Sequence, residues 1–523
     1  MIEVSVINQT GYSWAKNEEK TIWVKGFAIF KEQLLGAKEL INMLEDLADK
    51  DDIIKKVRLL NGLFTIIIKS KKECFLISDI TRTFPIVYYH NNKNWIITDN
   101  VSWLRKKYNL KKDDSSCKEF LASGLVTKNN SLFQNVYQVQ SGEIVSINQN
   151  KVNSIRYYIF PQMKEKFDIS FKENSDRLKN VLDDLGEKLL KQLNGRTAVI
   201  PLSGGLDSRL IVSLLKKKRY ENVICFTYGK YNSFEVRRSK KIAKKLGYPW
   251  YFIPYDDEIY DNFCSSKEFY EYTEYACNYL SIFSIQEYFV VKHLKERKIL
   301  PLNSVFIPGH AGDFIAGSHL KERYKLIDNN PDLLKAIVEK HYQLNKTSES
   351  QEVAKKIISF PFNEQPFFNM LEQWNWQERQ SKFIVNACRN YDFFGYDFLL
   401  PLWDKDLVDF FKELPFELRY RKKLYEYVLF KYYFKSLDIK FENNLKKWLL
   451  KLFLRLSENI FLTTFLKKYR DVNNTKQRDS QMLKCMNFKP IKYKNSNSLN
   501  VLWFLEKFME IDFELNCQND YIS

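Results

Sequence analysis

The residues best suited to chemistry lie in one short loop, which follows the apolar run Ala198–Leu202. Its two adjacent glycines lack Cβ atoms, so backbone N–H groups there can approach an anion closely. The helix expected over Leu206–Lys217 directs its free amides and positive dipole end at the same point. Two serine hydroxyls add donors, and an aspartate carboxylate can hold a magnesium ion that bridges phosphate oxygens. The segment therefore predicts a phosphate or pyrophosphate site, formed by Leu202, Ser203, Gly204, Gly205, Leu206, Asp207 and Ser208.

The hexapeptide Ser203–Ser208 lacks the spacing of a Walker A loop, which needs GxxxxGK[ST]. It resembles instead the SGGxDS pyrophosphate loop of ATP pyrophosphatases, a family that cleaves ATP between its α and β phosphates. A second glycine-spaced loop, within Val305–Gly317, is similar to the SGxGGDExxxG segment of asparagine synthetases. The resemblance implies that Asp207 and Asp313 share one magnesium ion. A plain helix cap remains the alternative interpretation of Asp313.

Further positions gain a role from the same resemblance. Phe226 and Thr227, at the end of the predicted strand Val223–Thr227, lie where the family contacts adenine, and Gly309 belongs to the second ATP-binding loop. His310 stands where asparagine synthetases carry an acidic side chain. A neutral imidazole there could accept the proton of an incoming amine, or it could simply hydrogen-bond within the glycine-rich turn.

The resemblance also implies a catalytic lysine in the later helical region, where it would compensate charge in the transition state. By position after Asp404 the candidates are Lys446 and Lys447, and Lys422 and Lys423 are alternatives. Lysines are abundant in this segment, and most lysines in proteins are solvated surface charges. The identity of the catalytic lysine therefore stays open.

Two kinds of hydrophobic pattern divide the 523 residues. From Phe171 helical periodicity begins, and strands and helices then alternate through Trp250–Ile253, which is typical of a parallel sheet. Beyond residue 265 the pattern is mainly helical. We therefore expect domains at residues 1–160 and 170–450, followed by a helical C-terminal extension at 451–523. Before residue 155 the chain reads as short strands, at Ile22–Phe30, Leu63–Ile68, Cys74–Ser78, Ile86–Tyr89 and Trp95–Thr98.

The N-terminal part is similar to class II glutamine amidotransferase domains, in Asn61–Phe64 and again in Leu121–Gly124. Active members use the cysteine after the initiator methionine as their nucleophile. Here that residue is Ile2, and the first cysteine is Cys74. The resemblance thus implies a pseudo-glutaminase, as in β-lactam synthetases and lasso-peptide cyclases. The expected fold class is α/β, with a layered β-sheet domain of Ntn-hydrolase type followed by an adenine-nucleotide-hydrolase-like parallel α/β domain and a helical extension.

Composition narrows the range of partners. A hydrophobic content of 45% and a charged content of 28% are typical of a globular protein. The formal net charge of +18 raises nucleic acid, anionic lipid and phosphorylated substrates as partners. No nucleic-acid reading motif accompanies the charge, which disfavours a nucleic-acid role. The basic and apolar segment Lys446–Arg470 could lie on a membrane surface, although its pattern favours a core or partner-facing helix.

Cysteine usage and the N-terminal sequence bear on the compartment. The eight cysteines include no CxxC pair, so we expect reduced, buried thiols rather than a zinc site. No signal peptide and no apolar run of 18 residues is evident. We therefore expect a cytoplasmic protein.

These features predict an asparagine synthase-like ligase that uses ATP and Mg²⁺ to adenylate a carboxylate and then transfers it to ammonia or an amine, releasing AMP. The sequence leaves open the carboxylate, which could be a small molecule or a sugar acid, the amine donor, a separate ammonia source and the oligomeric state. The alternatives are amidation of a sugar uronate in surface-polysaccharide biosynthesis, a tRNA-modifying pyrophosphate-loop enzyme, and a scaffold without activity.

Overall fold

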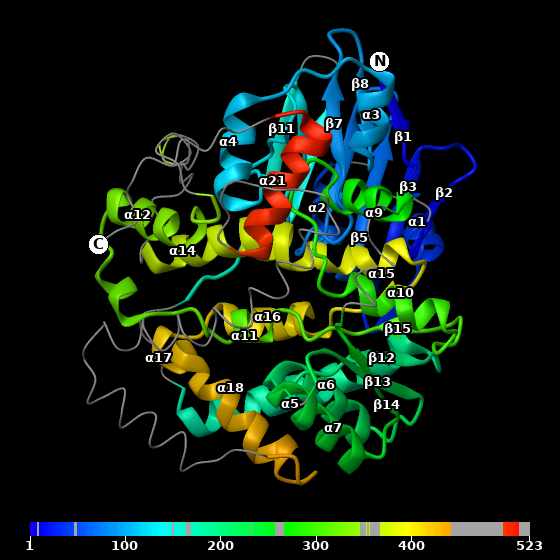
Figure 1. The fold of residues 1–523 in the computed structure, drawn as a ribbon. Helices are drawn as coiled ribbons and strands as arrows, with labels where there is room; N and C mark the ends of the chain where they lie inside the picture. The colour runs from blue at the N-terminus through cyan, green and yellow to red at the C-terminus, as the bar shows by residue number, and fades with distance from the viewer. Residues whose placement is uncertain are drawn as a thin grey trace, which may run out of the picture.

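The computed structural model describes residues 1–7, 10–45, 50–148, 151–163, 169–231, 233–256, 266–345, 352, 355, 367–440 and 495–511. The strands of the N-terminal part, blue to cyan in Figure 1, gather in one half of the molecule, and the parallel strands β12, β13 and β14 lie in the other half with α5, α6, α7 and α18. No helix among the described residues is long and apolar enough to span a membrane.

The N-terminal half contains two β-sheets that enclose a common apolar core. One sheet has the order β1-β8-β7-β9, and the other the order β11-β10-β6-β5-β3-β2, with β4 paired to β3. The expectation of a layered β domain is confirmed. The strands are β1 (Ile2–Ser5), β2 (Trp14–Lys16), β3 (Ile22–Phe30), β4 (Gln33–Leu35), β5 (Asn61–Lys69), β6 (Cys74–Ser78), β7 (Val87–His90), β8 (Trp95–Thr98), β9 (Val136–Gln138), β10 (Glu143–Ile147) and β11 (Val152–Arg156). Both sheets supply the side chains between them, among them Trp23, Ile67, Leu76, Tyr88, Ile97 and Val145.

Short helices cover the edges of this half. Helix α1 packs on β3, and α4 ends at Gly124, whose φ of +77° suits the residue that terminates a helix. The helices are α1 (Ala37–Glu45), α2 (Lys50–Arg58), α3 (Val101–Lys107) and α4 (Asp114–Ser123).

The C-terminal half is built on a five-stranded parallel sheet with the order β14-β13-β12-β15-β16. Its strands are β12 (Ala198–Pro201), β13 (Val223–Gly229), β14 (Trp250–Pro254), β15 (Val305–Phe306) and β16 (Asp397–Phe398). Helix α5 (Phe171–Leu193) starts at a capping serine, Ser170, which accepts the N–H of Glu173. Helices α6 (Leu206–Lys217) and α7 (Phe234–Leu246) alternate with the first strands. The expectation of a parallel α/β fold is confirmed, and its strand and helix positions agree with the sequence pattern.

The remaining described chain is mostly helical. Its α-helices are α9 (Lys267–Cys277), α10 (Tyr288–Glu296), α11 (Gly312–Ile315), α12 (Asn330–His341), α14 (Phe367–Trp374), α15 (Arg389–Phe393), α16 (Lys405–Lys412), α17 (Phe416–Arg419), α18 (Lys423–Val428) and α21 (Ser496–Met509). Other helical turns are η1 (Glu322–Leu326), the π-helix η2 (Asn375–Ile384), η3 (Val385–Cys388), η4 (Pro401–Trp403), η5 (Tyr420–Lys422) and the π-helix η6 (Leu429–Phe434).

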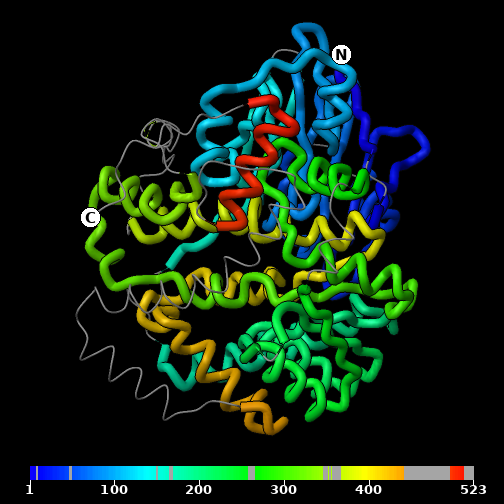
Figure 2. Tube along the Cα trace, in the orientation of Figure 1, coloured from blue at the N-terminus to red at the C-terminus, as the bar shows by residue number. Residues whose placement is uncertain are grey.

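Helix α21 returns to the N-terminal half, although it is the last described element. Figure 2 shows it, in red, beside the cyan segments, and the rings of Phe504 and Phe120 of α4 lie 6.0 Å apart. On another side Trp503 packs against Phe269 of α9 at 5.2 Å. This helix therefore packs against α4, from the N-terminal part of the chain, and against α9, which follows the first strands of the parallel sheet in sequence.

Polar contacts fix the two halves against each other. The Asn61 amide donates to the Asp404 carboxylate at 2.8 Å, and its carbonyl oxygen accepts the N–H of Lys405 at 2.8 Å. The fully buried Lys382 of η2 lies 2.6 Å from the Glu378 carboxylate and donates to backbone carbonyls of the N-terminal half. Buried charges of this kind hold one geometry because each needs its partner.

Candidate active site

The candidate site lies at the carboxyl ends of the parallel strands, where the strand order of the sheet reverses. The neighbours of β12 are β13 on one side and β15 on the other, so the order of the strands reverses at β12. Open α/β sheets bind ligands in such a crevice. A cavity of about 770 Å³ occupies this position, bordered by both glycine-containing loops, the end of β13, the start of α10 and the start of α21.

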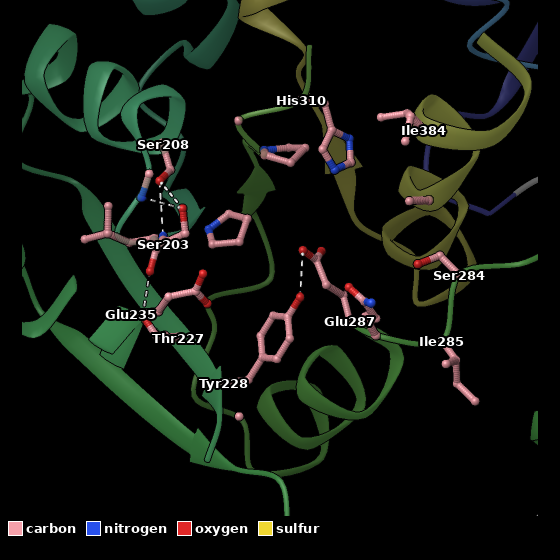
Figure 3. A pocket seen from close by; sticks show the side chains of 18 of the residues that line it. Ser203, Ser208, Thr227, Tyr228, Glu235, Ser284, Ile285, Glu287, His310 and Ile384 are labelled. Atoms are coloured by element: carbon pink, nitrogen blue, oxygen red, sulfur yellow. Dashed lines mark hydrogen bonds between the residues drawn. The ribbon is translucent and has the colours of Figure 1, made fainter. Parts of the chain in front are cut away.

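The Ser203–Ser208 loop is held by its own hydroxyls. The Ser203 N–H donates to Ser208 Oγ at 3.1 Å, and the two serine Oγ atoms lie 3.0 Å apart (Figure 3). The buried guanidinium of Arg209 donates to the Gly204 carbonyl at 2.9 Å. All the predicted loop residues except Gly204 line the cavity, because Gly204 packs under Arg238 instead. The loop is thus fixed in shape before any ligand binds.

Asp207 and Asp313 are brought together, as the sequence predicts. One oxygen of the Asp207 carboxylate accepts the N–H of Asp313 at 2.8 Å, and the other accepts the Tyr425 hydroxyl at 3.1 Å. Burial, and secondly the charge of Asp313, raise the pKa of Asp207 to about 7. Asp313 itself accepts from Lys422 Nζ at 2.7 Å. Two like charges therefore face each other at the mouth of the loop, with one lysine as counter-charge.

Two glycines allow this close approach. A Cβ at Gly312 would lie 2.6 Å from Cγ of Asp207, and one at Gly309 would lie 2.8 Å from the backbone nitrogen of Ser208. Contacts below 3.0 Å do not occur for real Cβ atoms. The second loop therefore needs glycine at both positions to press against the first.

Left-handed backbone marks the same region. Ala311 has a φ of +79°, and the consecutive residues Arg421 and Lys422 have φ values of +55° and +59°. Each such non-glycine residue costs on the order of 1 kcal/mol and persists where the surrounding structure enforces it. The strained turn at η5 aims Lys422 at Asp313, which indicates a functional constraint.

The two carboxylates fit a magnesium ion that is completed by phosphate oxygens and water. Mg²⁺ prefers oxygen ligands and usually takes one or two carboxylates plus substrate phosphates. Burial, and secondly the charge of Asp313, raise the pKa of Asp207, and a shared cation would stabilise both ionised carboxylates. Among the described residues, no group of three or more His, Cys, Asp or Glu side chains forms a complete metal site. Asp207 and Asp313 alone would hold the ion, and the rest of its shell would come with the nucleotide.

The predicted adenine contacts also line the cavity. Phe226 and Thr227 lie at the carboxyl end of β13. The Thr227 hydroxyl lies 2.7 Å from the Leu202 carbonyl and accepts the indole N–H of Trp250 at 3.1 Å. The Thr227 side chain therefore links β12, β13 and β14. An adenine base at this edge would then be contacted by backbone atoms and by the surfaces of aromatic rings.

His310 projects into the cavity from the second loop (Figure 3). Burial lowers the pKa of its imidazole to about 4, so the ring is neutral at pH 7. Its Nδ1 lies 3.5 Å from Sγ of Cys388, which leaves Nε2 as the ring nitrogen for a ligand. Its position is compatible with a proton acceptor for an incoming amine and also with a residue that only hydrogen-bonds within the glycine-rich turn.

Glu287 is the most prominent site residue that sequence reasoning missed. Its carboxylate projects into the cavity beneath His310, with the Tyr228 hydroxyl 3.5 Å from it (Figure 3). The Tyr391 hydroxyl donates to its other oxygen. Burial raises the pKa of this carboxyl. In the sequence, an acid before the apolar helical run Tyr288–Val291 indicates only a helix start, so no local signal marks Glu287 as part of a site.

Comparison with known proteins fixes the family. The asparagine synthase family model matches residues 191–455, just over half of the chain. The chain belongs to the asparagine synthase family. At this coarse level the match supports an ATP-dependent ligase that forms a C–N bond, and it leaves the substrates unassigned. No curated protein matches the chain.

Solved structures add partial likenesses. The NH3-dependent NAD synthetase from Campylobacter jejuni is 16% identical with a TM-score of 0.20, over 29% of this chain and 62% of its own length. The glutamine PRPP amidotransferase from B. subtilis is 8% identical with a TM-score of 0.20, over 69% and 78%. The NMN synthetase from Francisella tularensis is 16% identical with a TM-score of 0.19, over 49% and 97%. Scores this low carry no argument about function.

The predicted catalytic lysines of this asparagine synthase family member are only partly placed. Lys446 and Lys447 lie outside the described residues, as does the segment Lys446–Arg470. Of the two alternatives, Lys422 contacts Asp313 at 2.7 Å. Lys423 instead lies over the ring of Phe171, 5.5 Å from its centroid. Among the four candidates, Lys422 is the one with a described contact at the site.

Proposed function

We propose that this asparagine synthase family member is an ATP- and Mg²⁺-dependent, AMP-forming amide ligase that adenylates a carboxylate and transfers it to ammonia or an amine. The single observation that carries the proposal is the pair Asp207 and Asp313 at the mouth of the Ser203–Ser208 loop, where the Asp207 carboxylate accepts the backbone N–H of Asp313 at 2.8 Å. A scaffold without activity has no need to hold two carboxylates together, since their repulsion destabilises the fold.

In the first step, an oxygen of the substrate carboxylate attacks the α-phosphorus of ATP, and the bond from that phosphorus to the bridging oxygen of pyrophosphate breaks. The Ser203–Ser208 loop and the amino terminus of α6 bind the departing pyrophosphate. Lys422, which contacts Asp313, supplies positive charge beside it. Magnesium held by the two aspartates would neutralise phosphate charge.

In the second step, the amine nitrogen attacks the acyl carbon, and AMP leaves with the electron pair of the broken C–O bond. Once bonded to that carbon, the nitrogen becomes strongly acidic and must lose a proton. His310 is neutral at pH 7 because burial lowers its pKa to about 4, so its free Nε2 can accept that proton. Its weak basicity is sufficient for such an acidic donor.

We also propose that the N-terminal half is a pseudo-glutaminase. A thiol nucleophile reacts as the thiolate, which needs a low pKa and exposure. The described cysteines are all buried, and burial raises the pKa of Cys74 and Cys117 to about 12. Isoleucine at position 2 supports the same conclusion. An amine substrate or a separate ammonia source would then supply the nitrogen.

Among carboxylate substrates we keep a small molecule and a sugar uronate as candidates. The cavity of about 770 Å³ is large enough for ATP together with a modest acid.

The test compares wild type with Asp207→Asn by isothermal titration of α,β-methylene ATP, with and without Mg²⁺. Magnesium-dependent binding that is lost in the variant supports the ligase, and release of AMP and pyrophosphate with a carboxylate panel would then identify the acid. Asp51→Asn, an exposed aspartate on α2, serves as the control for loss of one negative charge. Equal binding by wild type and Asp207→Asn would refute the proposal.

A further inference from the structure

Glu287 gives the cavity a second chemical character, distinct from that of the phosphate loop. It lies at the amino-terminal end of α10, but its side chain caps no helical N–H and projects into the cavity instead. Among the described residues, no lysine, arginine or histidine forms an ion pair with it. The carboxylate is therefore available to a ligand.

The hydrogen bonds to Glu287 leave capacity unused. The hydroxyls of Tyr228 and Tyr391 each donate one hydrogen bond, one to each carboxylate oxygen. An ionised carboxylate offers about four acceptor positions, so roughly two remain. A cation that donates hydrogen bonds would satisfy these positions, and a hydrogen bond to a charged acceptor is stronger than one between neutral groups.

Aromatic rings line the same cavity as Glu287. Tyr228 stacks on Tyr255 with ring centroids 5.0 Å apart, and Tyr255 meets Phe289 edge-on at 5.7 Å. All three line the cavity. The negative faces of such rings attract alkylammonium ions, and a carboxylate among them adds a charged hydrogen-bond acceptor. This is the chemistry of an ammonium-binding pocket.

We propose that Glu287, with the rings of Tyr228 and Tyr255, forms the subsite for the amine substrate and selects a primary alkylammonium ion, whose nitrogen pairs with the carboxylate and gives it one proton before attacking the acyl carbon. The inference rests on the proposed ligase function for the identity of this ligand as a substrate. It implies that the nitrogen donor is a cationic amine rather than free ammonia alone. The phosphate loop and the Glu287 subsite then bind groups of opposite charge within one cavity.

The test titrates the full chain with n-butylammonium chloride and with n-butanol, its neutral isostere, both without nucleotide and with Mg²⁺ and α,β-methylene ATP. Wild type should bind n-butylammonium, and Glu287→Gln should weaken that binding on the order of 10- to 100-fold, the loss expected for a hydrogen bond to a charged group. Nucleotide affinity should change less than about threefold. Glu235→Gln, which removes a carboxylate that lines the α7 side of the cavity, is the matched control and should bind n-butylammonium like wild type.

Equal binding of n-butylammonium by wild type and Glu287→Gln would overturn the inference. So would a loss of nucleotide affinity in Glu287→Gln with amine binding intact, because the carboxylate would then serve the nucleotide. If Glu287→Gln fails to fold, the wild-type protein still tests the inference through its affinities for the two ligands. Equal affinity for n-butylammonium and n-butanol would contradict a charged subsite. A failure of the ligase proposal would give a different result. The wild-type protein would show no magnesium-dependent nucleotide binding, but it would still bind n-butylammonium more tightly than Glu287→Gln does.

Discussion

Gly312→Ala should disable the site while leaving the fold intact. The added methyl group would lie 2.6 Å from both Cγ and Oδ1 of Asp207 and 2.8 Å from Oδ2. An ordinary contact begins near 3.4 Å, so the carboxylate must move by about 0.8 Å. That shift breaks its hydrogen bonds with the Asp313 N–H and the Tyr425 hydroxyl, now 2.8 and 3.1 Å long.

The magnitude follows from these contacts. Hydrogen bonds to a charged group contribute about 1.5–3 kcal/mol, and a displacement of about 1 Å in a positioned group can reduce activity about 100-fold. We therefore expect magnesium-dependent affinity for α,β-methylene ATP to fall on the order of 10- to 100-fold. Overpacking costs about 1–3 kcal/mol, which the better helix propensity of alanine in α11 offsets by about 1 kcal/mol.

The assay is isothermal titration at fixed Mg²⁺, together with thermal unfolding in the absence of nucleotide. Gly186→Ala in α5 is the matched control, because its added methyl would meet the flexible Lys218 side chain at 3.0 Å and Leu214 at an ordinary contact distance of 3.7 Å. The control should bind the nucleotide like wild type and unfold at an equal or higher temperature. Wild-type affinity in Gly312→Ala would show that Asp207 does not position the metal and nucleotide.

Two further predictions concern the residues around the same loops. Lys422→Met removes the charge 2.7 Å from Asp313 and should lower the rate of AMP formation about 100-fold with little change in folding temperature, measured by pyrophosphate release; an unchanged rate would assign the catalytic charge to another lysine. Arg419→Met leaves the buried Glu372 carboxylate without its bidentate partner, at 2.7 and 2.8 Å, and should lower the free energy of unfolding by about 3–5 kcal/mol in denaturant titration; a loss below about 1 kcal/mol would contradict it.

Local sequence sufficed for the parts of the site that are contiguous in the chain. Three consecutive local patterns predict β12, its loop and α6. They are the apolar run Ala198–Leu202, the glycines after it and the helical periodicity that follows. The sequence likewise predicts strand β3 with its observed bounds, Ile22–Phe30, because a short apolar run and the polar turns beside it are local signals. The resemblance to asparagine synthetases added Asp313, which the structure places beside Asp207.

Only the tertiary structure decided which distant residues complete the cavity. Glu287 joins the site because α10 carries it to the carboxyl ends of the parallel strands, where Tyr228 and Tyr391 bind it. Lys422 reaches Asp313 from a left-handed turn, which no propensity scale predicts. The start of α21, which is the last described helix, also lines the cavity. Such contacts depend on packing between segments far apart in the chain. Local sequence patterns report only on residues that are neighbours in the chain, so these contacts could be found only in the tertiary structure.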